Sequence, residues 1–287
     1  MSGLALLSLS TSLYMKNNVL NIFILFFATF IVLESCSKES NVPESDPVAG
    51  MVKIASGYAA GAATYVNIYT KDSAFAGYNK LYIVLTDSIT GNNIDNASVS
   101  LNPMMQMAMM SHSSPKENPA SIAVNHVFEA SVTFIMPSSG GTWTLKTNVF
   151  NNENGKQGVL NCTINVKPTT QQKLYSFISL SDNSSKYFVG IVEPSKPFVG
   201  INDCELVIYK KQSMMLFPAD SSLTVVVTPE MPTMSHGSPN NINPVHIGNG
   251  HYKGKVNFTM TGFWRLNLTL KTGNTVSDST NYIDLTF

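Results

Sequence analysis

Two short segments of the chain place thioether and imidazole side chains at the same spacing, Met-x-x-Met-x-His. The residues are Met107, Met110 and His112 in the first segment and Met231, Met234 and His236 in the second. In both, a proline follows three residues after the histidine. Soft thioether sulfurs select Cu(I), and imidazole also binds copper. The spacing therefore predicts a copper site in each segment.

The other three histidines lie near these segments, so all five histidines occupy two regions of the chain. They are His126 after the first segment and His246 and His251 after the second. Pro, Ser, Asn and Gly interrupt both regions, which is typical of loops, and loops on a rigid scaffold often carry binding groups. We expect a loop and the strand that returns beside it to bring Met and His together. A Cu(II) site built on histidine alone stays open.

Packing and turn formation are the alternative for the repeated methionines and histidines, and packing is the prediction for several other side chains. Met104, Met105 and Met109 have no counterpart in the second segment and are predicted to fill gaps, as flexible methionines do. Trp143 and Trp264 are predicted to be central core residues. A place beside a metal-binding thioether is the alternative for the two tryptophans.

Similarity between the two parts of the chain extends beyond the methionines and histidines. Phe75, Gly77 and Asn79 align with Phe198, Gly200 and Asn202, and the series Phe134, Met136, Trp143 aligns with Phe258, Met260, Trp264. Two homologous units of about 110 to 120 residues follow, each near the size of one domain. We place them at 51–168 and 169–287.

Segments rich in β-branched and aromatic residues, ending in Gly, Pro, Asn or Ser, predict strands throughout both units. They are 80–88, 98–103, 129–137, 141–150 and 158–166 in the first unit, and 206–211, 222–229, 254–262, 263–271 and 282–287 in the second. Leu266, Leu268 and Leu270 alternate with polar residues, so one face is buried. We predict an all-β protein of two tandem immunoglobulin-like antiparallel β-sandwiches with almost no helix.

The N-terminal region resembles a bacterial lipoprotein signal. Lys16 precedes an apolar run, Val19 to Leu33, and Cys36 follows the run. The run is shorter than a membrane span, which needs roughly 20 residues. The resemblance implies that residues 1–36 are a signal, with Met15 as the true start and Cys36 lipidated. An uncleaved anchor helix is the alternative.

Residues 37–50 are predicted to be a flexible linker between the signal and the first unit. We expect a cell-envelope protein held to the membrane by lipid, on the periplasmic or the cell-surface side.

Composition narrows the class of function. Charged residues make up 13% of the chain and the formal net charge is zero. This balance argues against nucleic acid as a partner. The sequence lacks a nucleophile elbow, a metalloprotease motif, a P-loop and a dinucleotide-binding turn, so no enzyme is predicted. Cys162 and Cys204 are not in equivalent positions. We expect two buried free thiols there, with a bridge between them as the alternative.

A longer pattern joins these features in the second unit. It runs from Gly200-Ile201-Asn202 through Met231-Pro232-Thr233-Met234-Ser235-His236 and Gly250-His251-Tyr252 to Met260 and Gly262-Phe263-Trp264. This pattern resembles the YtkA-like domain, which is related to FixH-type periplasmic domains. The first unit departs from it, because Gln106 and Ala108 flank Met107 and no glycine precedes Phe128. The resemblance implies immunoglobulin-type sandwiches associated with copper handling and cation-pump assembly.

The sequence alone therefore leaves two possible functions. In one, the protein binds or transfers copper in the envelope, with an envelope protein or a metal transporter as its partner. In the other, it is an accessory β-sandwich whose Met-rich loops contact a protein partner.

Overall fold

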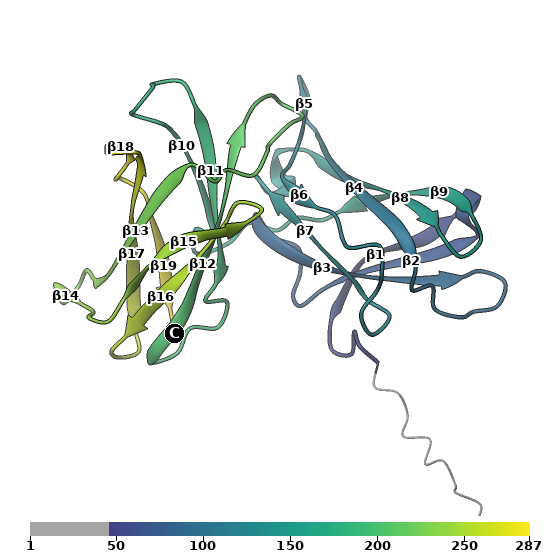
Figure 1. The fold of residues 1–287 in the computed structure, drawn as a ribbon, viewed down its shortest axis with the longest axis horizontal. Coiled ribbons are helices and arrows are strands. Elements are labelled where there is room, and N and C mark those ends of the chain that lie inside the picture. Colours follow the sequence, from purple (N-terminus) through teal and green to yellow (C-terminus); the bar gives the residue numbers. More distant parts are fainter. Residues whose placement is uncertain (1–45) are drawn as a thin grey trace, which may run out of the picture. The chain divides into compact units, whose positions relative to one another are not determined.

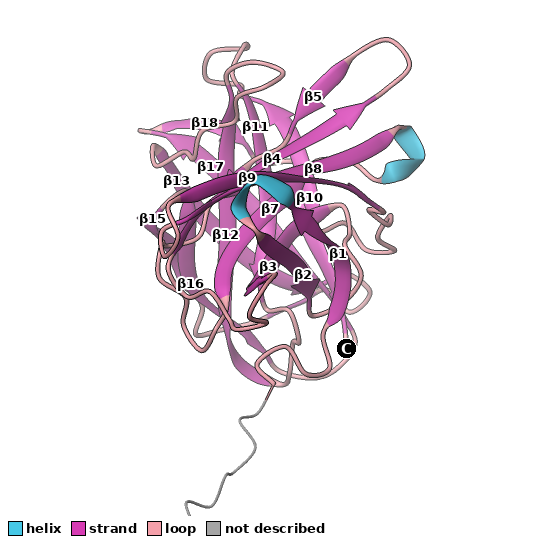
Figure 2. Ribbon diagram, turned by 90° about the vertical axis from the view of Figure 1, so that its right-hand side faces the viewer, coloured by secondary structure: helices cyan, strands magenta, loops and turns pink. Residues whose placement is uncertain are grey.

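The structure is a computed structural model that describes residues 46–287. The predicted signal, Cys36 and the predicted linker up to residue 45 lie outside the described residues. Within that range, strands are joined by loops and two single-turn 3-10 helices, Ala60–Ala62 and Ser138–Gly140 (Figure 2). No helix among residues 46–287 has the length and apolar character needed to cross a membrane. The all-β prediction is confirmed.

Nine strands form the N-terminal half, defined here as residues 52–164 (Figure 1). They are β1 (Val52–Ala59), β2 (Thr64–Thr70), β3 (Gly77–Asp87), β4 (Ala97–Gln106), β5 (Ser111–Ser113), β6 (Lys116–Glu117), β7 (Phe128–Phe134), β8 (Thr142–Asn151) and β9 (Lys156–Ile164).

Ten strands form the C-terminal half, defined here as residues 174–286. They are β10 (Leu174–Ile178), β11 (Lys186–Glu193), β12 (Gly200–Lys211), β13 (Leu223–Met231), β14 (His236–Gly237), β15 (Ile242–Gly248), β16 (His251–Phe258), β17 (Phe263–Thr272), β18 (Thr275–Asp278) and β19 (Tyr282–Thr286).

Both halves use the same strand order in two antiparallel sheets. In the N-terminal half the orders are β1-β2-β3-β7-β6 and β5-β4-β8-β9. In the C-terminal half they are β10-β11-β12-β16-β15 and β14-β13-β17-β18, with β19 also paired to β17. Each of the ten segments that the sequence predicted as strands overlaps one, because each contains the β-branched and aromatic residues that strands favour.

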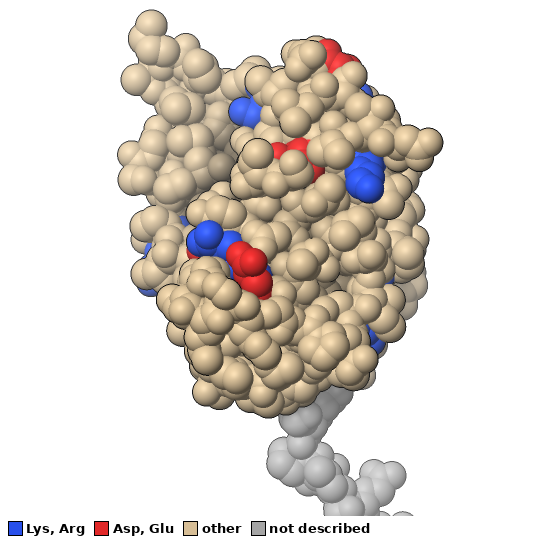
Figure 3. Space-filling view, turned by 90° about the vertical axis from the view of Figure 1, so that its left-hand side faces the viewer, with Lys and Arg blue, Asp and Glu red and all other residues tan. Residues whose placement is uncertain are grey.

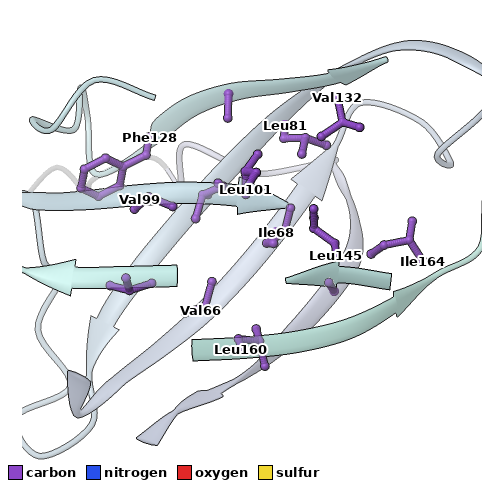
Figure 4. Packing of buried hydrophobic residues seen from close by; sticks show 14 of the residues in the cluster. Val66, Ile68, Leu81, Val99, Leu101, Phe128, Val132, Leu145, Leu160 and Ile164 are labelled. Atoms are coloured by element: carbon purple, nitrogen blue, oxygen red, sulfur yellow. The ribbon is translucent and has the colours of Figure 1, made fainter. Parts of the chain in front are cut away.

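Each half has a hydrophobic core between its own two sheets. Figure 4 shows side chains from both sheets of the N-terminal half meeting, among them Val66, Leu81, Leu101 and Leu145. The C-terminal core has the same construction. Trp143 and Trp264 are fully buried in their respective cores, as predicted from the sequence. These cores give the strand ends next to each tryptophan a fixed position.

A buried asparagine fixes the start of β3 and of β12. Asn79 accepts a hydrogen bond from the Phe75 amide at 3.0 Å and donates to the carbonyls of Phe75 and Gly77, both at 2.8 Å. Asn202 makes the same three bonds around Phe198 and Gly200. The aligned Phe-x-Gly-x-Asn segments thus encode one local structure that occurs twice.

The surface carries few charges. Figure 3 shows a face that is mostly uncharged, with a few scattered basic and acidic side chains and one place where a basic and an acidic group lie side by side, consistent with a charged fraction of 13%. Both cysteines of the described range are free; Cys204 is buried and Cys162 is partly exposed.

Candidate metal centre

A short hairpin at one end of the N-terminal half holds His112. Strands β4 and β5 pair so that Met105 lies opposite His112, and the turn closes with a bond from the Met107 amide to the Met110 carbonyl at 2.9 Å. Met105 is fully buried, and the His112 residue is only 4% exposed. Met107 is partly buried against the core edge, whereas Met110 is about half exposed at the tip.

The segment after β7 brings a sulfur to the imidazole. Met136 Sδ lies 3.2 Å from His112 Nε2. The Trp143 indole donates to the Met136 carbonyl at 2.9 Å, and its ring meets the His112 ring edge-on at a centroid distance of 5.4 Å. A buried tryptophan therefore positions the methionine and also packs against the histidine.

The glycine of the Gly-x-Trp motif allows this close packing. A Cβ at Gly141 would lie 2.4 Å from the Gln106 carbonyl oxygen and 3.3 Å from the methyl carbon of Met105. Any larger residue would therefore push the end of β4 away from Trp143, and Met105 would move with it.

Hydrogen bonding determines which imidazole nitrogen faces Met136. His112 Nδ1 lies 2.8 Å from the Ser113 carbonyl oxygen. Because a carbonyl oxygen only accepts, Nδ1 carries the proton. In the neutral ring Nε2 then presents a lone pair toward a thioether that also offers lone pairs. Metal-bound histidines commonly donate their other ring N–H to a backbone carbonyl, which orients the ring in this way.

The separation of these two atoms is close to that of two ligands of one metal ion. In tetrahedral zinc sites, metal–nitrogen and metal–sulfur bonds are about 2.0 and 2.3 Å, so two such ligands lie about 3.5 Å apart. The observed distance of 3.2 Å is about 0.3 Å shorter. Without a metal, only a protonated ring could bond the sulfur, through a weak N–H donor contact.

The C-terminal half repeats these parts. Met231 lies opposite His236 in the pairing of β13 with β14, and the Trp264 indole donates to the Met260 carbonyl at 2.9 Å. Met231 is buried, but His236 is exposed and Met260 is 37% exposed. His236 Nε2 lies 3.4 Å from the Thr259 hydroxyl. Met234 is also exposed, at the tip of the turn.

The register corrects the alignment of the two segments. Met105, and not Met107, takes the position of Met231, because each lies opposite the hairpin histidine. In the N-terminal hairpin His112 follows Met105 by seven positions, and in the C-terminal hairpin His236 follows Met231 by five. The shared Met-x-x-Met-x-His spacing therefore aligns turn residues with strand residues. Sequence reasoning missed Met105 as an equivalent residue for that reason.

Three of the predicted metal ligands lie elsewhere. His126 precedes β7 and His251 begins β16, whereas the hairpin histidines lie near the other ends of these strands. His126 Nδ1 contacts both carboxylate oxygens of Asp95, at 2.8 and 2.9 Å. His246 is exposed, and its ring packs on Tyr252. Strands β7 and β16 run from His126 and His251 toward the hairpins. The residues that reach the hairpins are therefore those that follow the strand ends, Met136 and Met260.

His251 is bonded to two carboxylates instead. Its Nδ1 lies 2.7 Å from Glu205 and its Nε2 lies 3.0 Å from Glu117 of the N-terminal half. Burial lowers the pKa of His251, but the hydrogen bonds and charges of Glu117 and Glu205 outweigh burial and raise the pKa to about 9. Tyr209 also donates to Glu117, at 3.0 Å. The ring is therefore a partly buried cation, and both of its nitrogens are bonded to carboxylates.

Across residues 46–287, His, Cys, Asp and Glu nowhere gather in a group of three that could hold a metal ion. The set around His112 differs, because it combines one imidazole with thioethers. Zinc and the harder metals favour nitrogen, thiolate and oxygen ligands, whereas thioethers favour Cu(I). The chemistry of this set therefore favours a soft metal.

Comparison with solved structures found β-rich matches of low identity. Domains 5–6 of the S-layer protein SbsC match at 11% identity and TM-score 0.28, covering 82% of this chain and 96% of that one. FdeC, an adhesin of Escherichia coli, matches at 16% identity and TM-score 0.25, covering 81% and 65%. A conserved domain protein from Bacillus anthracis matches at 10% and 0.34, covering 84% and 91%.

At the level of sequence, no curated protein matches the chain. The family model described as YtkA-like matches residues 181–269. This segment runs from the turn before β11 into β17, and includes the β13–β14 hairpin, Met260 and Trp264.

Proposed function

We propose that this chain is a non-enzymatic protein of the cell envelope that binds copper as Cu(I) and passes it on. The observation that carries the proposal is the 3.2 Å approach of His112 Nε2 to Met136 Sδ, with Nδ1 committed to the Ser113 carbonyl. Met105, opposite His112 in the register, is the nearest candidate for a further sulfur ligand. Support in the C-terminal half comes from the YtkA-like segment at 181–269.

A metal can bind the Nε2 lone pair of the neutral His112 ring directly. In a protonated ring it must first displace the proton on Nε2. Metal and proton compete for an imidazole nitrogen, so affinity falls at low pH. The buried indole of Trp143 excludes water from one side of the pair. Nothing in this arrangement calls for a nucleophile or a general base.

X-ray absorption at the copper edge tests the ligand set of the loaded full-length chain. We expect a shell of mixed nitrogen and sulfur, with sulfur at about 2.3 Å. Met136→Leu removes one sulfur at nearly constant volume and is expected to reduce the sulfur contribution. Met109→Leu is the matched control, since Met109 is 92% exposed at the hairpin tip. A shell of nitrogen and oxygen only would contradict the proposal.

Attachment to the membrane is part of the same proposal. Cys36 would carry the lipid after cleavage of the signal that precedes it, with the following residues as a tether. Metabolic labelling with a fatty-acid analogue tests this, because the label is expected on the unmodified chain and not on Cys36→Ser. A labelled Cys36→Ser chain, or an unlabelled and uncleaved parent chain, would contradict lipidation.

One observation favours a second function, contact with a protein partner in the envelope, such as a metal transporter. The hairpin tips expose thioether side chains, with Met109 at 92%, Met110 at 52% and Met234 at 58%. Flexible methionines suit adaptable binding surfaces. Partner capture that is lost in Met109→Ala/Met110→Ala, but unchanged by Met136→Leu and by copper chelation, would support this function over metal transfer.

A further inference from the structure

The two halves hold the same set of side chains at different exposure. In the N-terminal half, Met105, His112 and Met136 lie beside Trp143, and the first two are buried. In the C-terminal half, Met231 is buried beside Trp264, but His236 and Met260 are exposed. We propose that these are a retaining site and an exchange site for a soft metal, with the C-terminal set the one that trades metal with ligands in solution. This inference rests on the proposed function.

Specific bonds hold the N-terminal hairpin closed. The Ser113 hydroxyl donates to the Pro103 carbonyl of β4 at 2.9 Å, and the Ser113 amide donates at 2.9 Å to the carbonyl of Met214, in the loop after β12. Strand β5 therefore keeps three residues paired with β4, and His112 is the central one. The backbone that carries His112 is therefore held on one edge by β4 and on the other by the loop after β12.

The C-terminal hairpin lacks the corresponding side-chain bond. Gly237 follows His236 where Ser113 follows His112, so no hydroxyl at that position ties β14 to β13. Strand β14 has only two residues, and Ser235 before it adopts a positive φ of 49°. The next serine in each half is equivalent, since Ser114 donates to the Thr133 carbonyl and Ser238 to the Asn257 carbonyl. The difference is thus confined to the histidine end of the hairpin.

Exposure controls the rate at which a metal leaves such a site. A competing ligand reaches an exposed histidine and methionine directly, but a buried set is reached only after the hairpin opens. Local opening has its own free-energy cost, which slows exchange. We therefore expect metal to leave the C-terminal set at least about tenfold faster, and to leave the N-terminal set at the rate of hairpin opening.

Each site contains one of the two tryptophans of the chain, which gives each its own reporter. The experiment loads the full-length chain with Cu(I) under anaerobic conditions, mixes it with an excess of a Cu(I) chelator, and follows recovery of tryptophan fluorescence. Two phases are expected, separated by at least tenfold. Met260→Leu should remove the fast phase and Met136→Leu the slow phase, whereas Met215→Leu, at an exposed position outside both sets, should leave both.

The outcomes separate the two proposals. A slow phase alone, unchanged by Met260→Leu, would overturn the exchange site and leave copper binding at His112 standing. Two phases of equal rate, or a fast phase that belongs to Met136, would also overturn the assignment. No metal-dependent signal from either tryptophan would overturn the proposed function itself. Gly237→Ser is a second test in a residue that binds no metal, and we expect it to slow the fast phase.

Discussion

At the scale of single residues, the site depends on the orientation of one imidazole. His112 is buried, its Nδ1 is used by the Ser113 carbonyl, and its Nε2 faces the Met136 sulfur. Sequence spacing identified His112 but not this sulfur as its neighbour. The signal was present in the sequence, because Met136 and Met260 each precede a Gly-x-Trp motif. Their proximity to the histidines is a property of strand length, which composition does not reveal.

The orientation predicts a specific tautomer. In the metal-free chain at a pH where the ring is neutral, His112 should carry its proton on Nδ1, because Nδ1 has a carbonyl acceptor. Nitrogen-15 NMR distinguishes the two tautomers by the shifts of the ring nitrogens. Adding Ag(I), a redox-silent soft metal, should then move the Nε2 signal. A ring protonated on Nε2 would contradict the account of the site.

At the scale of strands and hairpins, the sequence predicted the central strands well and the short ones poorly. The ten predicted segments contain β-branched and aromatic residues, and several of them alternate apolar with polar residues, as half-buried strands do. Strands β5, β6 and β14 have two or three residues each, too few for any periodicity. Two of these short strands, β5 and β14, carry His112 and His236. The positions of the two histidines could therefore not be predicted from sequence periodicity.

Asn79 offers a test of how the sheets are held. Its three hydrogen bonds, at 2.8 to 3.0 Å, satisfy backbone groups at the start of β3. Asn79→Ala should lower the free energy of unfolding by about 2 kcal/mol, since a net hydrogen bond contributes roughly 0.5 to 1.5 kcal/mol. Denaturant titration measures this.

The matched control for this change is Asn161→Ala, at an exposed position of β9. A surface substitution of this kind should change the free energy of unfolding by only about 0.5 kcal/mol or less. Equal effects of the two substitutions would show that the Asn79 bonds are not stabilising.

At the scale of the whole described chain, a partly buried ion cluster joins the two halves. His251 lies between Glu205 and Glu117, with Tyr209 donating to Glu117 and Lys253 4.0 Å from Glu205. Tyr78 packs edge-on against the His251 ring, and burial raises the Tyr78 pKa. The sequence assigned His251 a metal role from its type and place. Its carboxylate partners come from two other strands, and no local pattern indicates them.

This cluster predicts how stability depends on pH. The folded pKa of His251 is about 9. This lies above its unfolded pKa, near 6.5. Its contribution is therefore complete below about pH 6.5 and is lost as the pH rises through the folded pKa. Burial raises the pKa of Glu117, but the bond and charge of His251 outweigh burial and lower it. The contribution of Glu117 is therefore present above its unfolded pKa and is lost in acid.

Replacing the histidine isolates the alkaline effect. His251→Gln should lower stability at pH 7 by about 2 kcal/mol, because charge-assisted bonds contribute roughly 1.5 to 3 kcal/mol each and a glutamine keeps part of them. It should also flatten the loss of stability between neutral pH and the folded pKa, measured by denaturant titration across pH. The exposed His246→Gln is the control. An unchanged alkaline slope in His251→Gln would show that another group titrates there.

The most direct test of the central claim is a competitive Cu(I) titration of the full-length chain under reducing, anaerobic conditions. The account predicts tight saturation near two equivalents, a fall to about one in Met136→Leu, and no change in Met109→Leu. Double replacement, His112→Ala with His236→Ala, should abolish tight binding. Absence of binding above background in the parent chain, or two tight equivalents remaining in Met136→Leu, would contradict it.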